Sequence, residues 1–225
     1  MKTVTVKPVT AISLTAAHLS LGAVGMFLVL LALLHLIERE FDLSWRFMSE
    51  YALGSYGWVM VLGFFALALS CAALFAAIRS HISTLGGKIG LGILLVVAVA
   101  MVMAGLFPQD PVTAKPDELT TQGNLHALAA MVGIPGFAFA AVLISLSLVR
   151  HPAWASARRL LFWTAHFYWI ALAAMFVYLG VAVPHAGGFG PDVYAGWFNR
   201  LVVLAQCAWL IATAWHAAQL SRPTA

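Results

Sequence analysis

Long apolar runs separated by short polar connections dominate the chain. Six mostly apolar windows occur, at about 17–37, 57–78, 89–107, 126–149, 160–183 and 197–220. Each is close to the roughly 20 residues that an α-helix needs to cross the hydrocarbon core of a bilayer. The pattern therefore predicts an all-α polytopic membrane protein with six transmembrane helices in one bundle. Because the connections are short, we expect residues 1–225 to form a single transmembrane domain with no separate soluble part.

Composition agrees with the hydrophobic pattern. Hydrophobic residues make up 63% of the chain and charged residues 9%, which is outside the range of soluble globular domains. The first window follows Lys2 and Lys7 as the apolar region of a signal peptide would, but it is longer than such an apolar region and lacks a small-residue cleavage pattern before Glu38. We expect it to be retained. Cys71 and Cys207 fall inside apolar windows, so we interpret them as packing residues.

The charged residues predict the orientation. Six spans place both termini on one side, and eight basic residues gather there: Lys2, Lys7, Arg79, Lys88, Arg150, Arg158, Arg159 and Arg222. The other side has four, Arg39, Arg46, Lys115 and Arg200. By the positive-inside rule, the termini are expected to be cytoplasmic. The net charge of +4 comes from helix ends, which gives no support for nucleic-acid binding.

All eight acidic residues lie on the predicted outer side: Glu38, Glu40, Asp42, Glu50, Asp110, Asp117, Glu118 and Asp192. Four of them belong to the segment 38–58, EREFDLSWRFMSEYALGSYGW, which we expect to form the lid or one wall of a site. Its glycines permit tight turns, and we predict a short interfacial or re-entrant helix near Glu50. If the first helix continues through Asp42, then His35, Glu38 and Asp42 stack on one face. The alternative is a plain helix end at the membrane interface.

Further polar residues occur where the other outer connections meet the spans. Pro108 and Pro111 should hold Asp110 at the membrane edge. Arg200 lies about one turn inside the last window, where an arginine is costly unless it reaches water or pairs. We therefore expect its partner to be Glu50, Asp110 or a ligand headgroup.

The fourth window has its own signals. We expect His126 to stand at its start, with Thr121 or Asn124 as the helix cap. Pro135, which lies between Gly133 and Gly136, should kink this helix and open space against its neighbours.

Four short motifs carry a resemblance: SEYALGSYGW after the first window, FPQDP after the third, TQGNLHALAA opening the fourth and FNRL in the sixth. In order and placement they resemble the bacterial and archaeal membrane family known as domain of unknown function 998. The resemblance implies a six-helix bundle, distantly like the Frag, Dram and Sfk membrane proteins, some of which are associated with lipid remodelling or distribution. It supplies no reaction. It singles out Ser49, Glu50, Tyr51, Gly54, Gly57, Trp58, Pro108, Asp110, Thr121, Gly123, His126 and Arg200.

The first functional hypothesis is an outward-facing polar cavity that binds or handles a lipid or another amphiphile. The candidate ligand-binding residues are Glu38, Ser49, Glu50, Tyr51, Asp110, Thr121, His126 and Arg200. Membrane lipids are the expected partners, and a membrane-protein partner or a homo-oligomer is left open. The expected location is the cytoplasmic membrane of a bacterium or archaeon, with the polar site on the extracytoplasmic side.

Two other classes of function stay open. His35, His126, His185 and Asp110 have side chains of the type that bind zinc, and Ser49 could act as a nucleophile, so a metal-assisted hydrolase or a lipid-modifying enzyme is an alternative. The chain has no HExxH, GxSxG or P-loop motif that would assign catalytic residues. The third class is an accessory subunit of a membrane complex.

Overall fold

The computed structural model describes residues 11–220, so Lys2, Lys7 and Arg222 lie outside the described residues. These residues form helices and no strand. Six helices are long and apolar enough to cross a membrane, which confirms the predicted all-α fold with six transmembrane helices. They are α1 (Ala11–Ile37), α2 (Gly57–Ile78), α3 (Leu85–Leu106), α4 (Thr121–Leu148), α5 (Arg158–Ala186) and α6 (Ala195–Leu220). Three short 3₁₀ helices, η1 (Met48–Leu53), η2 (Arg79–His81) and η3 (Pro152–Ala157), lie in the connections.

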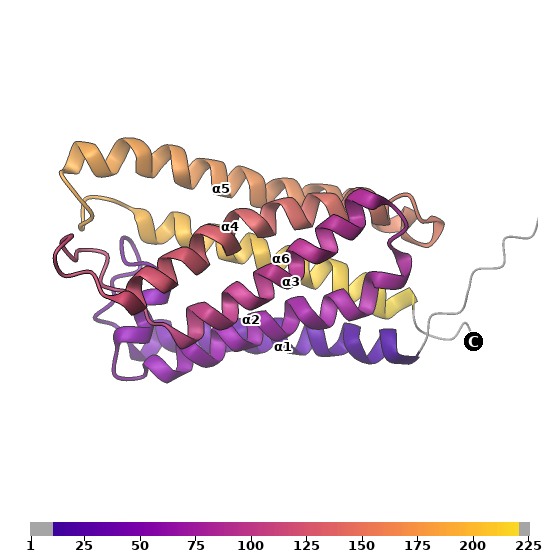
Figure 1. Cartoon of the computed structure of the whole chain (residues 1–225), viewed down its shortest axis with the longest axis horizontal. Coiled ribbons are helices and arrows are strands. Elements are labelled where there is room, and N and C mark those ends of the chain that lie inside the picture. The colour runs from indigo at the N-terminus through magenta and orange to yellow at the C-terminus, as the bar shows by residue number, and fades with distance from the viewer. Residues whose placement is uncertain (1–10, 221–225) are drawn as a thin grey trace, which may run out of the picture.

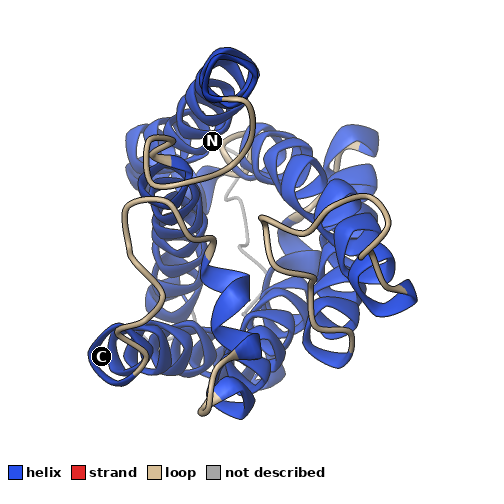
Figure 2. Cartoon of the chain, turned by 90° about the vertical axis from the view of Figure 1, so that its left-hand side faces the viewer, coloured by secondary structure: helices blue, strands red, loops and turns tan. Residues whose placement is uncertain are grey.

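The six helices form a bundle in which each packs against its neighbours in the chain and α1 also packs against α6 (Figure 1). We call the end that carries η1 the η1 end, and Figure 2 looks onto this end. The connections 107–120 and 187–194 lie at the same end, and η2 and η3 lie at the opposite end. In Figure 1, α5 diverges from α4 toward the η1 end. Of the helix pairs that are neighbours in the chain, α4 and α5 are the least closely packed.

Small residues bring the helices close together. Gly87 and Gly90 of α3 face α4, where a Cβ atom on Gly90 would lie 2.9 Å from Leu143. Close approach of this kind is how membrane helices gain packing energy, because lipid supplies little hydrophobic driving force between them. Ser20 of α1 and Ser70 of α2 also form a reciprocal pair, each hydroxyl donating to the other's backbone carbonyl at 3.0 Å.

Two predicted helix starts differ from the structure. The helix α3 begins at Leu85 instead of 89, because Thr84 caps it by accepting a hydrogen bond from the Gly87 N–H at 3.1 Å. The helix α4 begins at Thr121 instead of 126, so it includes the polar turn that sequence alone assigned to the loop. It continues through Pro135. The helix α1 ends at Ile37, where the first predicted window also ends, so of the two alternatives left open the stack of three polar residues through position 42 does not form.

Candidate functional site

The short helix η1 (Met48–Leu53) closes the η1 end, which confirms the short helix predicted there. Its Glu50 side chain is fully buried and joins η1 to the connection 107–120. The carboxylate accepts hydrogen bonds from the backbone N–H groups of Phe47 (2.9 Å) and Val112 (3.0 Å) and forms an ion pair with Arg46 (3.0 Å). Burial raises the pKa of Glu50, and the Val112 N–H and Arg46 partly offset this effect. Glu50 therefore holds η1 in place, and protein groups engage both of its carboxylate oxygens.

Arg200 of α6 links η1 to α1 and α6 through hydrogen bonds. Its Nε donates to His35 Nε2 of α1 at 3.0 Å, and its Nη2 donates to the Tyr51 hydroxyl of η1 at 3.2 Å. Its Nη1 donates to the carbonyl oxygens of Arg46 (2.8 Å) and Gly196 (3.1 Å). The planar guanidinium suits this task because its donors point in several fixed directions. Arg200 is buried and so joins α1, η1 and α6 from inside the bundle.

The prediction that Arg200 pairs with Glu50 or Asp110 is wrong, since it forms an ion pair with neither among the described residues. Its hydrogen-bond partners are neutral acceptors. His35 Nδ1 lies 2.5 Å from the Leu31 carbonyl oxygen, which can only accept, so Nδ1 carries the hydrogen and Nε2 is free to accept from Arg200. His35 is thus neutral in this arrangement, and both of its ring nitrogens are in use.

Glu38 follows α1 and is almost fully buried. Its Oε1 accepts a hydrogen bond from the backbone N–H of Tyr56, at the turn between η1 and α2. Gly54 leaves the space for this carboxylate, because a Cβ atom there would overlap it. Burial is the main cause that raises the pKa of Glu38, and the nearby Glu40 carboxyl raises it further. This explains Gly54 of the SEYALGSYGW motif by packing and not by ligand binding.

Asp110 has a similar structural role at the start of α4. Its carboxylate accepts from both the backbone N–H and the hydroxyl of Thr120, at 2.8 Å each. Thr120 in turn accepts from the Gly123 N–H at 2.9 Å, so Thr120 is the helix cap in place of Thr121 or Asn124. Thr121 is exposed at the first position of the helix. A side chain at Gly123 would overlap the Asp110 carboxylate, which explains the glycine.

A cavity of about 80 Å³, which we call the chamber, lies below η1 and between α1, α2, α3, α4 and α6. Its polar lining consists of Ser49, His126, Asn199 and Gln206. Most of the remaining wall is apolar and includes Phe27, Phe64, Leu67 and Met101. The described residues that line it include no Asp, Glu, Lys or Arg. The chamber is therefore a small apolar space with a few uncharged polar groups.

A second cavity of about 420 Å³, which we call the lateral groove, adjoins the chamber and runs between α4, α5 and α6. The two cavities share Ser49, Ala130, Ile134, His126 and Asn199 in their walls. The other walls of the groove are mainly apolar and include Phe47, Met131, Pro135, Met175, Phe176 and Leu179.

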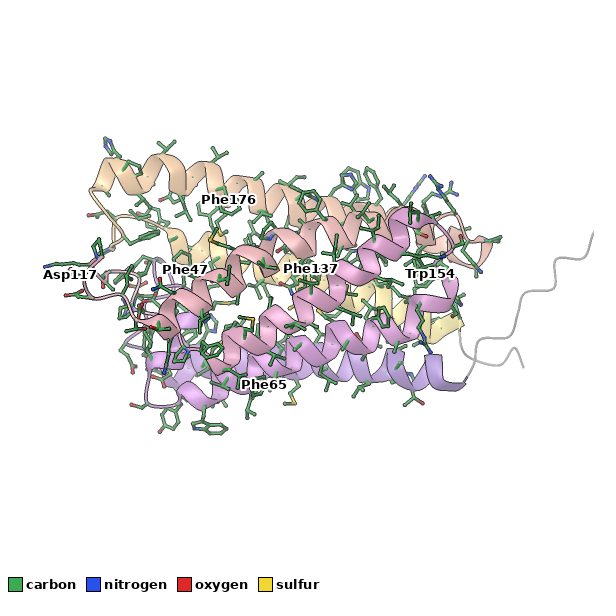
Figure 3. All side chains as sticks on the ribbon, viewed as in Figure 1. Phe47, Phe65, Asp117, Phe137, Trp154 and Phe176 are labelled. Carbon is green, nitrogen blue, oxygen red and sulfur yellow. The ribbon has the colours of Figure 1, made fainter. Side chains whose placement is uncertain are left out.

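Exposure shows where the groove opens. Met131 of α4 and Phe176 of α5 are 74% and 57% exposed, so the groove opens on the side of the bundle where lipid would lie. Phe176 and Phe47, both labelled in Figure 3, mark two of its walls. The volume falls in the range of about 300–1,000 Å³ that is typical of small-molecule sites.

The polar groups of the chamber are only partly used by the protein. Asn199 Oδ1 accepts from the Met48 N–H at 3.0 Å, and the Ser49 hydroxyl donates to Gln109 Oε1. His126 Nδ1 lies 2.9 Å from the Phe107 carbonyl oxygen and 3.2 Å from that of Ala104. Gln206 Nε2 is buried and has no hydrogen-bond partner among the described residues.

Of the eight predicted ligand-binding residues, the structure brings Ser49 and His126 to the chamber. The other six do not line the chamber or the lateral groove: Glu38, Glu50, Tyr51, Asp110, Thr121 and Arg200. Most of these hold the η1 end together, as described above. Arg200 instead borders a separate apolar groove between α1 and α6.

The four zinc-ligand candidates do not gather. No group of three or more His, Cys, Asp or Glu side chains within residues 11–220 is placed to hold a metal ion. His35 contacts Arg200, His126 contacts the Phe107 carbonyl oxygen at the end of α3, Asp110 contacts Thr120, and His185 is exposed at the end of α5. Ser49 donates to Gln109 and not to a histidine, so the hydroxyl is not paired with a base in this arrangement.

Sequence reasoning missed Gln206 and Asn199. For Gln206 the signal was available, because an amide in the middle of the apolar run VVLAQCAWLIA is costly unless it meets a partner.

Sequence reasoning also missed a cluster at the opposite end of the bundle, where Trp154 Nε1 donates to His81 Nδ1 at 2.7 Å. His81 stacks on His151 with ring centroids 4.9 Å apart, and His216 packs on Trp154. These residues come from separate connections and α6, and no sequence spacing relates them.

Six apolar helices closed into a bundle define a multi-pass α-helical membrane protein. Within this class, the chain belongs to the family described as protein of unknown function (DUF998), which matches residues 21–216. The family resemblance seen in the sequence is thereby confirmed. No curated protein and no solved structure matches the chain.

Proposed function

We propose that this protein binds a membrane amphiphile, with the polar head in the chamber and the apolar tail in the lateral groove. The observation that carries the proposal is the adjacency of the two cavities, one with partly unpaired polar groups and one apolar and open to the side of the bundle. An amphiphile has the same division, and lateral entry would let its tail stay in hydrocarbon while its head reaches the interior. An aqueous solute would gain nothing from the apolar walls of the groove.

The proposal includes an orientation. Charge placement supports a cytoplasmic position for both termini, so the η1 end and its chamber would face the extracytoplasmic side of the cell membrane. The amphiphile would then enter from the outer leaflet. The short helix η1, which Glu50 and Arg200 hold in place, would separate the bound head from the aqueous phase.

The test is native mass spectrometry of the gently solubilised full chain, with Ala130→Phe as the decisive variant. Ala130 lines both cavities, so a phenyl ring there fills the space between them. We expect the wild-type protein to retain one lipid that Ala130→Phe loses. Ala127→Phe is the matched control, because Ala127 lies on the same helix with an exposed side chain.

Two results would contradict the proposal. One is a wild-type protein that retains no lipid and gains no thermal stability from any added membrane lipid, since a ligand that binds the folded state must stabilise it. The other is equal lipid retention by Ala130→Phe and Ala127→Phe when both variants fold.

A further inference from the structure

We propose that the chamber selects an uncharged head that both donates and accepts hydrogen bonds, of which a hydroxyl group is the simplest example. Gln206 and His126 would be the two residues that recognise it. This inference rests on the proposed function and names the chemical class of the amphiphile. It gives no contact with the head to Arg200, for which a ligand headgroup was one of the expected partners.

Gln206 provides the first argument. Its side chain is 2% exposed, it lines the chamber, and its Nε2 has no partner among the described residues. Buried polar groups in proteins are nearly always hydrogen-bonded, so an unpaired amide beside a cavity points to a group that occupies the cavity. The amide N–H can donate to the oxygen of a bound head.

His126 provides the complementary acceptor. Carbonyl oxygens can only accept, so the contacts of Nδ1 with Phe107 and Ala104 place the ring hydrogen on Nδ1. The Nε2 atom of the neutral ring is then an acceptor. The two contacts with α3 also fix the ring, which packs edge-on against Phe64 with centroids 5.7 Å apart. A hydroxyl hydrogen can therefore be donated to a preoriented nitrogen.

The lack of charged side chains around the two cavities argues against a head that carries a phosphate or an ammonium group. The described residues that line the chamber and the lateral groove include no side chain with a full charge. The charged groups nearby are already engaged, Arg46 with Glu50 and Arg200 with His35 and Tyr51. A charged head would lose its hydration without gaining a counter-ion, which is strongly unfavourable. The cavity of about 80 Å³ also favours a small head, because one water needs about 10–15 Å³ on the same measure.

The experiment compares ligands that share one tail and differ in the head. The full chain in phosphatidylcholine nanodiscs is titrated with cetyl alcohol, cetyl phosphate, cetyltrimethylammonium or hexadecane, and binding is read by native mass spectrometry and by the shift in Tm. We expect cetyl alcohol to bind at least about tenfold more tightly than either charged compound. We also expect Gln206→Leu to weaken cetyl alcohol about tenfold, the loss expected for one hydrogen bond. Hexadecane binding should be unaffected by this variant.

Gln219→Leu is the matched control, because Gln219 lies on the same helix with an exposed side chain. It should bind all four compounds as the wild type does. Gln206→Leu should fold, since leucine replaces an unpaired amide among apolar neighbours.

The outcomes separate the two proposals. Charged compounds that bind as tightly as cetyl alcohol would overturn the selection for a neutral head, and so would unchanged cetyl alcohol binding by Gln206→Leu, which is the result expected if only water meets the amide. If none of the four compounds binds and Ala130→Phe has no effect, then the amphiphile site itself is refuted.

Discussion

Replacing Arg200 tests whether the η1 end is held by the geometry of one guanidinium. In Arg200→Met the acceptors on His35, Tyr51 and Arg46 lose their donor, whereas the Gly196 carbonyl keeps its helical N–H. An unsatisfied buried polar group costs about 1–3 kcal/mol. Taking about 1 kcal/mol for each of the three acceptors, because part of the loss is offset by no longer burying a charge, the variant should lose about 3 kcal/mol of unfolding free energy.

The assay is SDS-induced unfolding in mixed micelles, followed by near-ultraviolet circular dichroism. Arg200→Lys separates charge from geometry: a lysine keeps the charge but cannot reach acceptors in several fixed directions, so it should still lose about 2 kcal/mol. Tyr51→Phe should cost about 1 kcal/mol in the wild type and almost nothing in Arg200→Met. This difference is the coupling energy of the hydrogen bond between the two side chains.

The control is Arg39→Met, because Arg39 is exposed at the same end and makes a single side-chain contact with the Leu36 carbonyl. It should change the unfolding free energy by less than about 0.5 kcal/mol. If Arg200→Met is as stable as this control, or if Arg200→Lys restores the wild-type stability, the reasoning from hydrogen-bond geometry is refuted.

Three further predictions concern the carboxylates and glycines of the η1 end. Gly54→Ala should displace the Glu38 carboxylate and lower stability by about 1–3 kcal/mol in the same unfolding assay; wild-type stability would show that the carboxylate can move freely. The pKa of Glu50 is higher in the folded than in the unfolded chain, so folding takes up a proton between the two values. Its contribution to stability is full below the unfolded pKa and is lost as pH rises through the folded pKa. Unfolding measured across this interval should show a weaker pH dependence in Glu50→Gln, and an unchanged slope would contradict the direction of the shift. Asp110→Ala should cost about 1 kcal/mol through the cap at Thr120, with amphiphile retention unchanged by native mass spectrometry; loss of the ligand in a folded variant would restore Asp110 to the binding site.

From the sequence, the amphiphile hypothesis depended mainly on charged residues, whereas the proposal made from the structure depends on the uncharged side chains of Gln206 and His126. Charge density singled out Glu38, Glu50 and Asp110, which lie after α1, in η1 and between α3 and α4, all at the η1 end. Each accepts hydrogen bonds from nearby backbone, which a sequence cannot display. A polar residue at a helix end has the same appearance in a sequence whether it binds a ligand or fixes a turn.

The sequence by itself determined the six helices, the membrane class, the short helix near Glu50 and the family, because each depends on local composition or on motifs in a fixed order. Tertiary structure alone decided which polar groups meet a partner. Arg200 meets His35 across 165 positions of the chain, whereas Gln206 Nε2 has no hydrogen-bond partner among the described residues. Hydrogen-bond satisfaction depends on the rotation and spacing of neighbouring helices, and apolar spans of nearly uniform hydrophobicity do not encode that rotation in any local pattern. The chamber and the lateral groove are therefore properties of the packing of the bundle.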